Sequence, residues 1–455
     1  MSGGAGPVAA WIASPGRSLT GRLRVPGDKS VSHRSVMLGA LAEGTTRVTG
    51  FLEGEDTRAT AAILQRLGVR IEATGDGERV VHGVGLHGLS ASRSPLDCGN
   101  AGTGMRLLAG LLAGQAFDSV LIGDASLSKR PMRRVIDPLA RMGARIDSEG
   151  GLPPLRIHAK NVLQGIDYEC PVASAQVKSA ILLAGLYADG PTTVREPHPT
   201  RDYTERMLSA FGADIDFAPG LATLRPGRAL RATTVDVPAD FSSAAFFLVA
   251  ASVIPGSHLV LDRVGVNPRR TGLLDALTLM GADITVRAAG EQGGEPVADI
   301  EVRAARLRGA VIPESVVPDM IDEFPALFTA AALAEGDTVV TGAAELRVKE
   351  SDRIAVMAEG LRALGAVIDE RPDGAVITGS GFTANASAAS VDERHGRLRG
   401  GHADSRGDHR IAMSLAIAAQ CAAGEVRIDD VANVATSFPG FDALARGVGF
   451  GLRLA

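Results

Sequence analysis

Cationic and hydroxyl side chains gather at the start of a predicted helix in the stretch PGDKSVSHR, residues 26–34. A short apolar strand precedes this stretch, and an apolar helical run follows it. The first N–H groups of a helix lack partners within the helix, and the positive end of the helix dipole points the same way, so anions bind there. The stretch therefore predicts a helix start that attracts an anion.

Similar polar clusters precede other predicted helices along the chain. They are SLSKRPMRR (126–134), TRDYTER (200–206), NPRRTG (267–272), RVKESDR (347–353), CGNAGTGMR (98–106), VASAQVKS (172–179), MIDEFP (320–325) and RGDHRIAM (406–413). One such cluster alone is more often a solvated helix face with i,i+4 ion pairs. Nine clusters at helix starts favour a shared site over unrelated surface faces.

The cluster RVKESDR illustrates how helix geometry would place these groups. Apolar residues recur at helical spacing across residues 354–364, so we expect Ser351 to be the N-cap. Lys349, Glu350 and Arg353 would then lie at the N-terminal mouth of the helix. In VASAQVKS, both readings of Ser174 stay open, because a serine at a helix start serves equally well as a structural cap or as a ligand.

Other classes of site find no support in the sequence. His33 and His409 belong to no metal-ligand spacing with Cys or Glu, so we predict no metal. CGNAGTGMR is neither a Walker sequence nor a dinucleotide fingerprint, and no serine or cysteine nucleophile signature accompanies GDHR. Gly102 is of interest because a residue without Cβ lets a ligand approach the backbone closely.

An internal repeat organises the elements that would carry these clusters. It reads LGVRI (67–71), MGARI (142–146), FGADI (211–215), MGADI (280–284), LGAVI (364–368) and, less regularly, VGFGL (448–452). Each copy follows a strand-like segment and an amphipathic run, and six small-residue apolar helices interleave with them. This order predicts an α/β architecture of six repeats, each about 75 residues long. We expect three repeats in a body spanning 25–236, and three in a second body made of 1–24 plus 237–455.

Composition sets further limits. A chain of 455 residues exceeds what one hydrophobic core supports, which agrees with two bodies. A net charge of −5 argues against nucleic-acid binding. Three cysteines without a CxxC pair predict free, buried thiols in a reducing compartment, so we expect a cytoplasmic protein. Residues 1–20 lack the features of a signal peptide and are predicted to be a flexible leader, and no segment is apolar enough to span a membrane.

Taken in order, the motifs PGDKSVSHR, GNAGTGMR, KRPM, ASAQVKSA, MIDEFP, LRVKESDR and GDHRIAM resemble those of the 5-enolpyruvylshikimate-3-phosphate synthase family, from about residue 20 to the C-terminus. The resemblance implies the inside-out α/β barrel, or enolpyruvyl transferase fold: two domains, each of three βαβαββ units, with the active site in the cleft between them. It also implies transfer of the enolpyruvyl group of phosphoenolpyruvate to the 5-hydroxyl of shikimate 3-phosphate, on the pathway to chorismate and the aromatic amino acids. No cofactor or metal would be needed, and a monomer is expected.

The resemblance also assigns roles to residues. The phosphoenolpyruvate ligands would be Lys29, Gly102, Arg130, Gln176, Arg353 and Arg410. The shikimate 3-phosphate ligands would be Lys29, Ser30, Arg34, Ser174, Ala175, Gln176, Arg201, Asp322 and Lys349. The catalytic groups would be Lys29, Asp322 as the base, Glu350 as the group that moves a proton at carbon 3, and Lys349 between the substrate hydroxyl and the departing phosphate. Glu323 would raise the proton affinity of Asp322 by like-charge repulsion.

Two positions depart from relatives, and rival functions remain. Gly102 stands where glyphosate-insensitive relatives carry alanine, which predicts sensitivity to glyphosate. Thr436 stands where some relatives have lysine.

The nearest rival function is that of the enolpyruvyl transferase acting on UDP-N-acetylglucosamine, although the loop GDASLSKRP lacks the reactive cysteine typical of that family. A non-catalytic protein that binds anionic metabolites on the same scaffold is a second rival. An RNA-end-modifying enzyme of related fold is less favoured because the chain is acidic.

Overall fold

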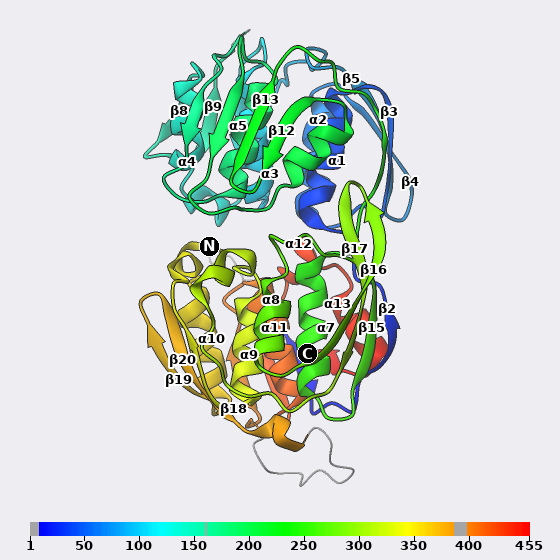
Figure 1. The fold of residues 1–455 in the computed structure, drawn as a ribbon, viewed down its shortest axis with the longest axis vertical. Coiled ribbons are helices and arrows are strands. Elements are labelled where there is room, and N and C mark those ends of the chain that lie inside the picture. Colours follow the sequence, from blue (N-terminus) through cyan, green and yellow to red (C-terminus); the bar gives the residue numbers. More distant parts are fainter. Residues whose placement is uncertain (1–8, 160–161, 386–397) are drawn as a thin grey trace, which may run out of the picture. The chain divides into compact units, whose positions relative to one another are not determined.

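The computed structural model describes residues 9–159, 162–385 and 398–455 of the chain. These residues divide into two compact units (Figure 1). The N-terminal unit consists of the described residues within 27–238 and of Glu291–Glu295. The C-terminal unit consists of the described residues up to Pro26, of Ala239–Gly290 and of the described residues from Pro296 onward. Residues 1–8 of the predicted leader lie outside the described residues.

The N-terminal unit alternates strands and helices along the chain. Its elements are α1 (Lys29–Leu41), β3 (Glu43–Thr49), α2 (Glu55–Arg66), β4 (Arg70–Gly75), β5 (Glu78–Val84), β6 (Leu96–Asp97), α3 (Gly102–Ala113), β7 (Ser119–Ile122), η1 (Leu127–Lys129), α4 (Arg133–Arg141), β8 (Ile146–Glu149), β9 (Leu152–Ile157), β10 (Asp167–Glu169), α5 (Ala175–Gly185), β11 (Thr192–Arg195), α6 (Tyr203–Ala210), β12 (Asp214–Ala218), β13 (Leu221–Arg225) and β14 (Thr234–Asp236). They form sheets of order β14-β3-β5-β4, β6-β7-β9-β8 and β10-β11-β13-β12.

The C-terminal unit follows the same alternation. Its elements are β1 (Trp11–Ser14), β2 (Thr20–Leu23), α7 (Phe241–Val253), β15 (His258–Gly265), α8 (Gly272–Leu279), β16 (Asp283–Gln292), β17 (Glu295–Arg303), η2 (Glu314–Asp319), α9 (Phe324–Leu333), β18 (Glu335–Val340), η3 (Ala344–Val348), α10 (Arg353–Ala363), β19 (Val367–Arg371), β20 (Gly374–Ser380), η4 (Phe382–Asn385), β21 (Gly401–Asp404), α11 (His409–Gln420), β22 (Val426–Asp429), α12 (Val434–Ser437), α13 (Phe441–Val448) and β23 (Gly451–Leu454). Its sheets have the orders β16-β17-β15-β2, β18-β20-β19 and β21-β22-β1-β23.

Four of the six sheets in the described part of the chain share a pairing pattern. In β10-β11-β13-β12, the first pair of strands is parallel and the next two pairs are antiparallel. The sheets that contain β3, β7 and β22 repeat this pattern with their own strands. The predicted α/β architecture built from repeated units is therefore confirmed.

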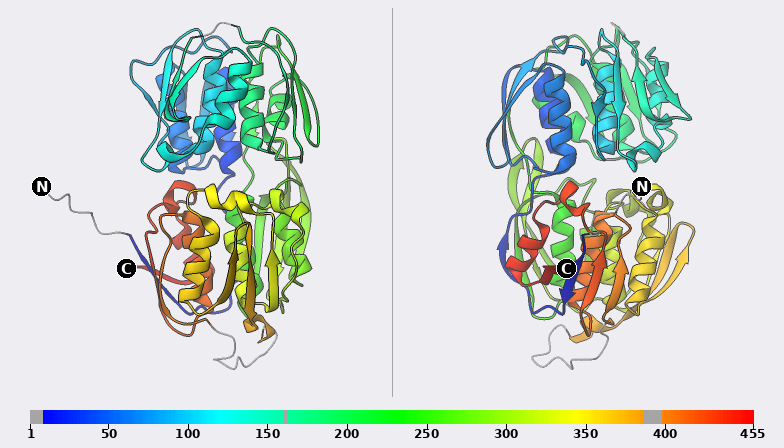
Figure 2. Two further views of the ribbon diagram at one scale, coloured as in Figure 1. Left: turned by 90° about the vertical axis from the view of Figure 1, so that its left-hand side faces the viewer. Right: turned by 180° about the vertical axis from the view of Figure 1, so that it is seen from behind.

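Two kinds of helix alternate in every repeat. The small-residue helices α1, α3, α5, α7, α9 and α11 are almost completely buried. Figures 1 and 2 show that the strands lie outside these helices in each unit, so the helices form the core and the sheets form the wall. Burial on all sides explains why the sequences of α7 and α9 are mostly apolar and contain no charged residue.

The repeated glycine motif marks where an amphipathic helix turns into a strand. After α2, α4, α6, α8, α10 and α13, the glycine adopts a positive φ, at Gly68, Gly143, Gly212, Gly281, Gly365 and Gly449. A left-handed residue just beyond a helix closes its last turn, and glycine adopts that conformation without a Cβ clash. This requirement explains the recurrence of the motif along the chain.

The prediction of a flexible leader is wrong for residues 11–14. They form β1, which pairs antiparallel with both β22 and β23. The Trp11 side chain is buried, and its ring stacks on Phe441 with centroids 5.4 Å apart. Packing of this aromatic side chain in the core of the C-terminal unit holds the segment in place.

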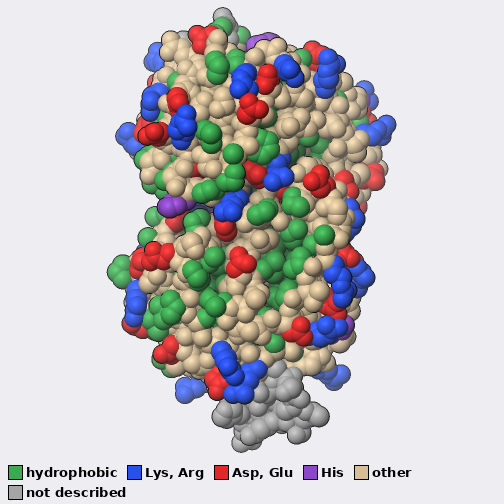
Figure 3. Space-filling model, in the orientation of Figure 1, with side chains coloured by type: hydrophobic (Ala, Val, Ile, Leu, Met, Phe, Trp, Pro, Cys, Tyr) green, Lys and Arg blue, Asp and Glu red, His purple; other side chains and the backbone are tan. Residues whose placement is uncertain are grey.

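Three further observations bear on the class of protein. No helix in the described part of the chain combines the length and apolar character that crossing a membrane requires. On the face shown in Figure 3, basic and acidic side chains are interspersed over each unit. The predicted free, buried thiols are confirmed at Cys98, Cys170 and Cys421.

Candidate active site

The start of α1 carries the first predicted anion ligands. Asp28 is the N-cap, and its carboxylate accepts a hydrogen bond from the Val31 N–H at 2.9 Å. The ammonium group of Lys29 forms an ion pair with Asp56. The Lys29 side chain remains 26% exposed, whereas Asp56 is 6% exposed. Asp56 therefore holds Lys29 from the protein side while part of the lysine faces solvent.

Arg34 lies one turn further along α1 and is buried. Its Nε donates to Thr204 Oγ1 at 2.6 Å, and its two terminal nitrogens donate to Ser179 Oγ at 2.8 Å and to the Ser30 carbonyl at 2.9 Å. Burial lowers the pKa of Arg34 to about 10, so the group remains cationic at neutral pH. Because Arg34 binds groups from three helices, it fixes the start of α1 against α5 and α6.

Gly102, Arg130 and Gln176 lie together at the start of α3. A Cβ on Gly102 would lie 3.0 Å from a terminal nitrogen of Arg130 and 3.1 Å from one of Arg106. Arg106 also donates to Gln176 Oε1 at 2.9 Å. The absent side chain of Gly102 therefore leaves room between two guanidinium groups. Arg106 was not predicted, although it lies inside the motif CGNAGTGMR.

The remaining predicted ligands of this unit lie at the starts of α5 and α6. Ser174 is the N-cap of α5 and accepts from the Val177 N–H at 3.4 Å, so its capping role is confirmed. Ala175 is the first residue of that helix. Arg201 lies in the loop before α6, and Tyr203 is the first residue of that helix. The Tyr203 hydroxyl donates to Asp28 Oδ2 at 3.1 Å, which joins the start of α6 to the start of α1.

In the C-terminal unit, Arg353 lies at the centre of a buried charge network. Its guanidinium contacts Asp408 at 2.9 Å, Glu350 at 2.6 Å and Asp322 at 3.4 Å. Burial lowers the pKa of Arg353, but the three carboxylates raise it by more, so the net shift is upward. The network thus brings together both predicted acid–base groups and one predicted anion ligand.

Arg410 joins the same network from α11. A terminal nitrogen donates to the Asp322 carbonyl at 3.1 Å and lies 3.8 Å from Glu323. Its Nε is buried and has no hydrogen-bond partner among the described residues. A buried cationic donor without an acceptor is unfavourable, so this atom marks a position where an anionic ligand would be stabilised.

Glu323 is buried beside Asp322 and accepts a hydrogen bond from Ser242. Burial raises the pKa of Glu323, and the negative charge of Asp322 raises it further.

Lys349 lies 3.8 Å from Glu345, and burial lowers the pKa of Lys349. The side chain of Lys349 is 23% exposed and that of Glu350 is 29% exposed, so both remain accessible from solvent.

The predicted N-cap of α10 is wrong by one residue. Asp352 caps the helix by accepting from the Ala355 N–H at 3.0 Å, whereas Ser351 donates to Asp408 Oδ2 at 3.0 Å. Asp408 is itself the N-cap of α11. Neither Asp408 nor Asp56 was predicted as part of the site, because the pairing of each with a cation depends on tertiary structure. Thr436 lies in α12, where its hydroxyl donates to the Asn433 carbonyl at 2.7 Å.

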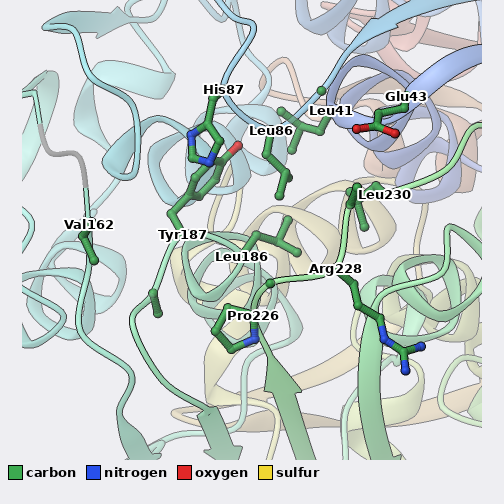
Figure 4. A pocket seen from close by; sticks show the side chains of 14 residues that line it. Leu41, Glu43, Leu86, His87, Val162, Leu186, Tyr187, Pro226, Arg228 and Leu230 are labelled. Atoms are coloured by element: carbon green, nitrogen blue, oxygen red, sulfur yellow. The ribbon is translucent and has the colours of Figure 1, made fainter.

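A separate cavity in the N-terminal unit has a volume of about 410 Å³ (Figure 4). Its lining includes Leu41 at the end of α1 and Leu186 at the end of α5. The predicted ligands lie at the opposite ends of these two helices, so this cavity is not part of the candidate site. Among the described residues, no group of three or more His, Cys, Asp or Glu side chains could hold a metal ion.

Comparison with known proteins agrees with this arrangement. Residues 13–444 match the family described as EPSP synthase (3-phosphoshikimate 1-carboxyvinyltransferase). A 3-phosphoshikimate 1-carboxyvinyltransferase of Xanthomonas campestris pv. campestris (strain B100) is 68% identical over 443 residues, which cover 97% of this chain and 98% of the relative. One from Xanthomonas oryzae pv. oryzae (strain PXO99A) is 66% identical over 446 residues, 98% of each chain.

Solved structures give the same result for the fold. The 2.37 Å structure of EPSP synthase from Acinetobacter baumannii matches with a TM-score of 0.87 and 52% sequence identity, covering 98% of this chain and 100% of that one. The predicted enolpyruvyl transferase fold is thereby confirmed. With the sequence match, the fold and the clustered cations in agreement, the chain belongs to the EPSP synthase (3-phosphoshikimate 1-carboxyvinyltransferase) family.

Proposed function

We propose that this chain carries out the reaction of its family: it transfers the enolpyruvyl group of phosphoenolpyruvate to the 5-hydroxyl of shikimate 3-phosphate and releases phosphate. The observation that carries the proposal is the network in which Asp322 and Glu350 contact Arg353. A protein that only binds anions needs cations, and carboxylates at the site would repel its ligand. Carboxylates beside cations therefore favour proton transfer on a bound anion.

The two substrates together bring four anionic groups, two carboxylates and two phosphates. Binding them requires several cations and helix N-termini, because charges removed from water must be paired. We assign Lys29, Ser30, Arg34, Ser174, Ala175, Gln176 and Arg201 of the N-terminal unit to shikimate 3-phosphate, with Asp322 and Lys349 of the C-terminal unit. We assign Lys29, Gly102, Arg130, Gln176, Arg353 and Arg410 to phosphoenolpyruvate.

The reaction is an addition followed by an elimination. In the addition, Asp322 takes the proton of the 5-hydroxyl, the hydroxyl oxygen bonds to carbon 2, and Glu350 gives a proton to carbon 3. In the elimination, Glu350 takes a proton back from carbon 3, the double bond between carbons 2 and 3 re-forms, and the bond from carbon 2 to the phosphate oxygen breaks. The proton that Asp322 took leaves with the phosphate, so both carboxyl groups return to their starting protonation state. Lys349 stabilises the departing phosphate, and its lowered pKa makes its proton easier to transfer.

A phosphate-release assay tests the proposal. The purified chain is mixed with phosphoenolpyruvate and either shikimate 3-phosphate or UDP-N-acetylglucosamine. We expect phosphate release only with shikimate 3-phosphate, the acceptor that the names of the Xanthomonas relatives indicate. Release only with UDP-N-acetylglucosamine would favour the sister transferase, and no release with either would favour the anion-binding protein. The monomeric state and the cytoplasmic location stay predictions.

A further inference from the structure

The N-terminal unit contains a buried ion cluster that none of the proposed substrate contacts uses. Lys178 of α5 places its ammonium 2.8 Å from Glu196 and 2.8 Å from Glu205, and the three side chains are 3%, 0% and 3% exposed. Taking several charges out of water is unfavourable, and apolar residues of similar volume often replace buried ion pairs without loss of stability. Stabilisation of the fold alone is therefore a weak explanation for this cluster.

One side of the cluster holds the loop that carries Arg201. The Glu196 carboxylate accepts from the Thr200 backbone N–H at 3.2 Å and from the Thr200 hydroxyl at 2.5 Å. The Lys178 ammonium donates to the Thr200 carbonyl at 3.4 Å. Three polar groups of Thr200 are thus bound by the cluster, and Arg201 is the next residue.

The chain neighbours of two cluster residues bind Arg34. Ser179, next to Lys178, and Thr204, next to Glu205, both accept hydrogen bonds from the Arg34 guanidinium, at 2.8 and 2.6 Å. Their hydroxyls also bind each other at 2.7 Å. Burial lowers the pKa of Arg34, and the negative charge of Glu205 opposes that shift. Lys178 and Arg34 together balance the two buried carboxylates.

We propose that Lys178, Glu196 and Glu205 are positioning residues that hold Arg201 and Arg34 in place for binding the shikimate 3-phosphate acceptor. The inference rests on the proposed function, because Arg201 and Arg34 are there assigned to this substrate. It predicts an effect on one substrate only. The cluster binds Thr200 beside Arg201, and the chain neighbours of Lys178 and Glu205, which are Ser179 and Thr204, bind the Arg34 side chain. Among the described residues, the hydrogen bonds of the cluster do not reach Gly102, Arg130 or Gln176.

Steady-state kinetics of Lys178→Met tests the inference. The variant keeps a long unbranched side chain but leaves the two carboxylates without their shared cation. We expect the KM for shikimate 3-phosphate to rise by about tenfold or more, while the KM for phosphoenolpyruvate at saturating acceptor stays near its wild-type value. The matched control is Leu208→Ala in α6, a fully buried apolar residue whose truncation lowers stability through a cavity. Its KM values should not change.

A second variant keeps the test valid if Lys178→Met does not fold. Glu205→Gln preserves the shape of the side chain and its ability to accept from Lys178 while removing one buried charge. It should raise the KM for shikimate 3-phosphate in the same way. If either variant folds and leaves that KM unchanged, or raises both KM values equally, the cluster serves stability only and the inference is wrong.

Failure of the inference can be told apart from failure of the proposed function. If the wild-type chain releases no phosphate, the proposed function fails. Calorimetric titration of the wild-type chain and of Glu205→Gln with shikimate 3-phosphate then tests the inference alone. Weaker binding by the variant supports it, and equal binding, or no binding by either chain, overturns it.

Discussion

The Nε atom of Arg353 lies 2.9 Å from Oδ2 of Asp408, and the two side chains are 1% and 0% exposed. Asp408 also caps α11 by accepting from the backbone N–H of Arg410 at 2.9 Å. The buried Asp408 carboxylate therefore orients two proposed ligands of phosphoenolpyruvate. It binds the side chain of Arg353 and the backbone N–H of Arg410.

Replacing Asp408 by Asn should lower the free energy of unfolding by about 3–5 kcal/mol, because it removes the fully buried one of the three carboxylates that pair with the buried Arg353 guanidinium. Asparagine remains a good N-cap, so the change isolates the loss of charge. Urea unfolding measures the effect. The control is Glu359→Gln, which removes the ion pair between the Arg406 and Glu359 side chains, 53% and 62% exposed, and should leave stability nearly unchanged because solvent screens exposed pairs. Equal losses in the two variants would contradict the account.

His33 should make stability depend on pH. Burial lowers its pKa well below the ordinary value of 6.5, and the charges of Lys29 and Arg34 lower it further. Below pH 6.5 the unfolded chain binds a proton at this residue and the folded chain does not, so the free energy of unfolding falls as the pH falls. The loss should reach up to about 1.4 kcal/mol per pH unit until the folded-state pKa is passed.

Comparison of the wild-type chain with His33→Gln checks this effect, because glutamine does not titrate. Urea unfolding at several values between about pH 5 and about pH 8 should show a steeper loss on acidification for the wild-type chain. Parallel pH profiles would show that His33 does not contribute.

Gly102→Ala should weaken binding of phosphoenolpyruvate. The added methyl group would lie 3.0 Å from Arg130 and 3.1 Å from Arg106, where it narrows the space between the two cations. We expect the KM for phosphoenolpyruvate to rise by about fivefold, equivalent to about 1 kcal/mol, and the inhibition constant of glyphosate to rise as well.

The control for this variant is Gly190→Ala, in the same unit, because a Cβ there would meet no atom within 4 Å. Wild-type kinetics are expected for the control. Two results together would refute the prediction. One is an unchanged KM for phosphoenolpyruvate in Gly102→Ala, and the other is a glyphosate inhibition constant that is already high in the wild-type chain and is the same in the variant.

Much of the fold could be predicted from the sequence because it repeats. The glycine that ends each amphipathic helix is required by backbone conformation, so it leaves a regular trace such as Gly143 and Gly281. Trp11 was misjudged because its burial depends on strands β22 and β23, which lie more than four hundred residues further along the chain. The grouping of residues 291–295 with the N-terminal unit likewise depends on tertiary contacts.

The candidate site was predictable to the extent that its residues lie at helix starts. The structure places Glu350, Arg353 and Asp322 in one network, as clustering of charged motifs suggested. Local sequence could not identify the partners that hold these groups. Asp408 lies 55 positions from Arg353, and only the packing of α10 beside α11 brings the two together.

The central claim is that Glu350 transfers the proton at carbon 3, and the turnover of Glu350→Gln in the phosphate-release assay tests it most directly. We predict that kcat falls by about 100-fold or more while the KM values stay near those of the wild-type chain, because glutamine keeps the shape but cannot transfer a proton. Glu359→Gln, the same change on the exposed face of α10, should keep wild-type turnover. Wild-type turnover in Glu350→Gln would contradict the account.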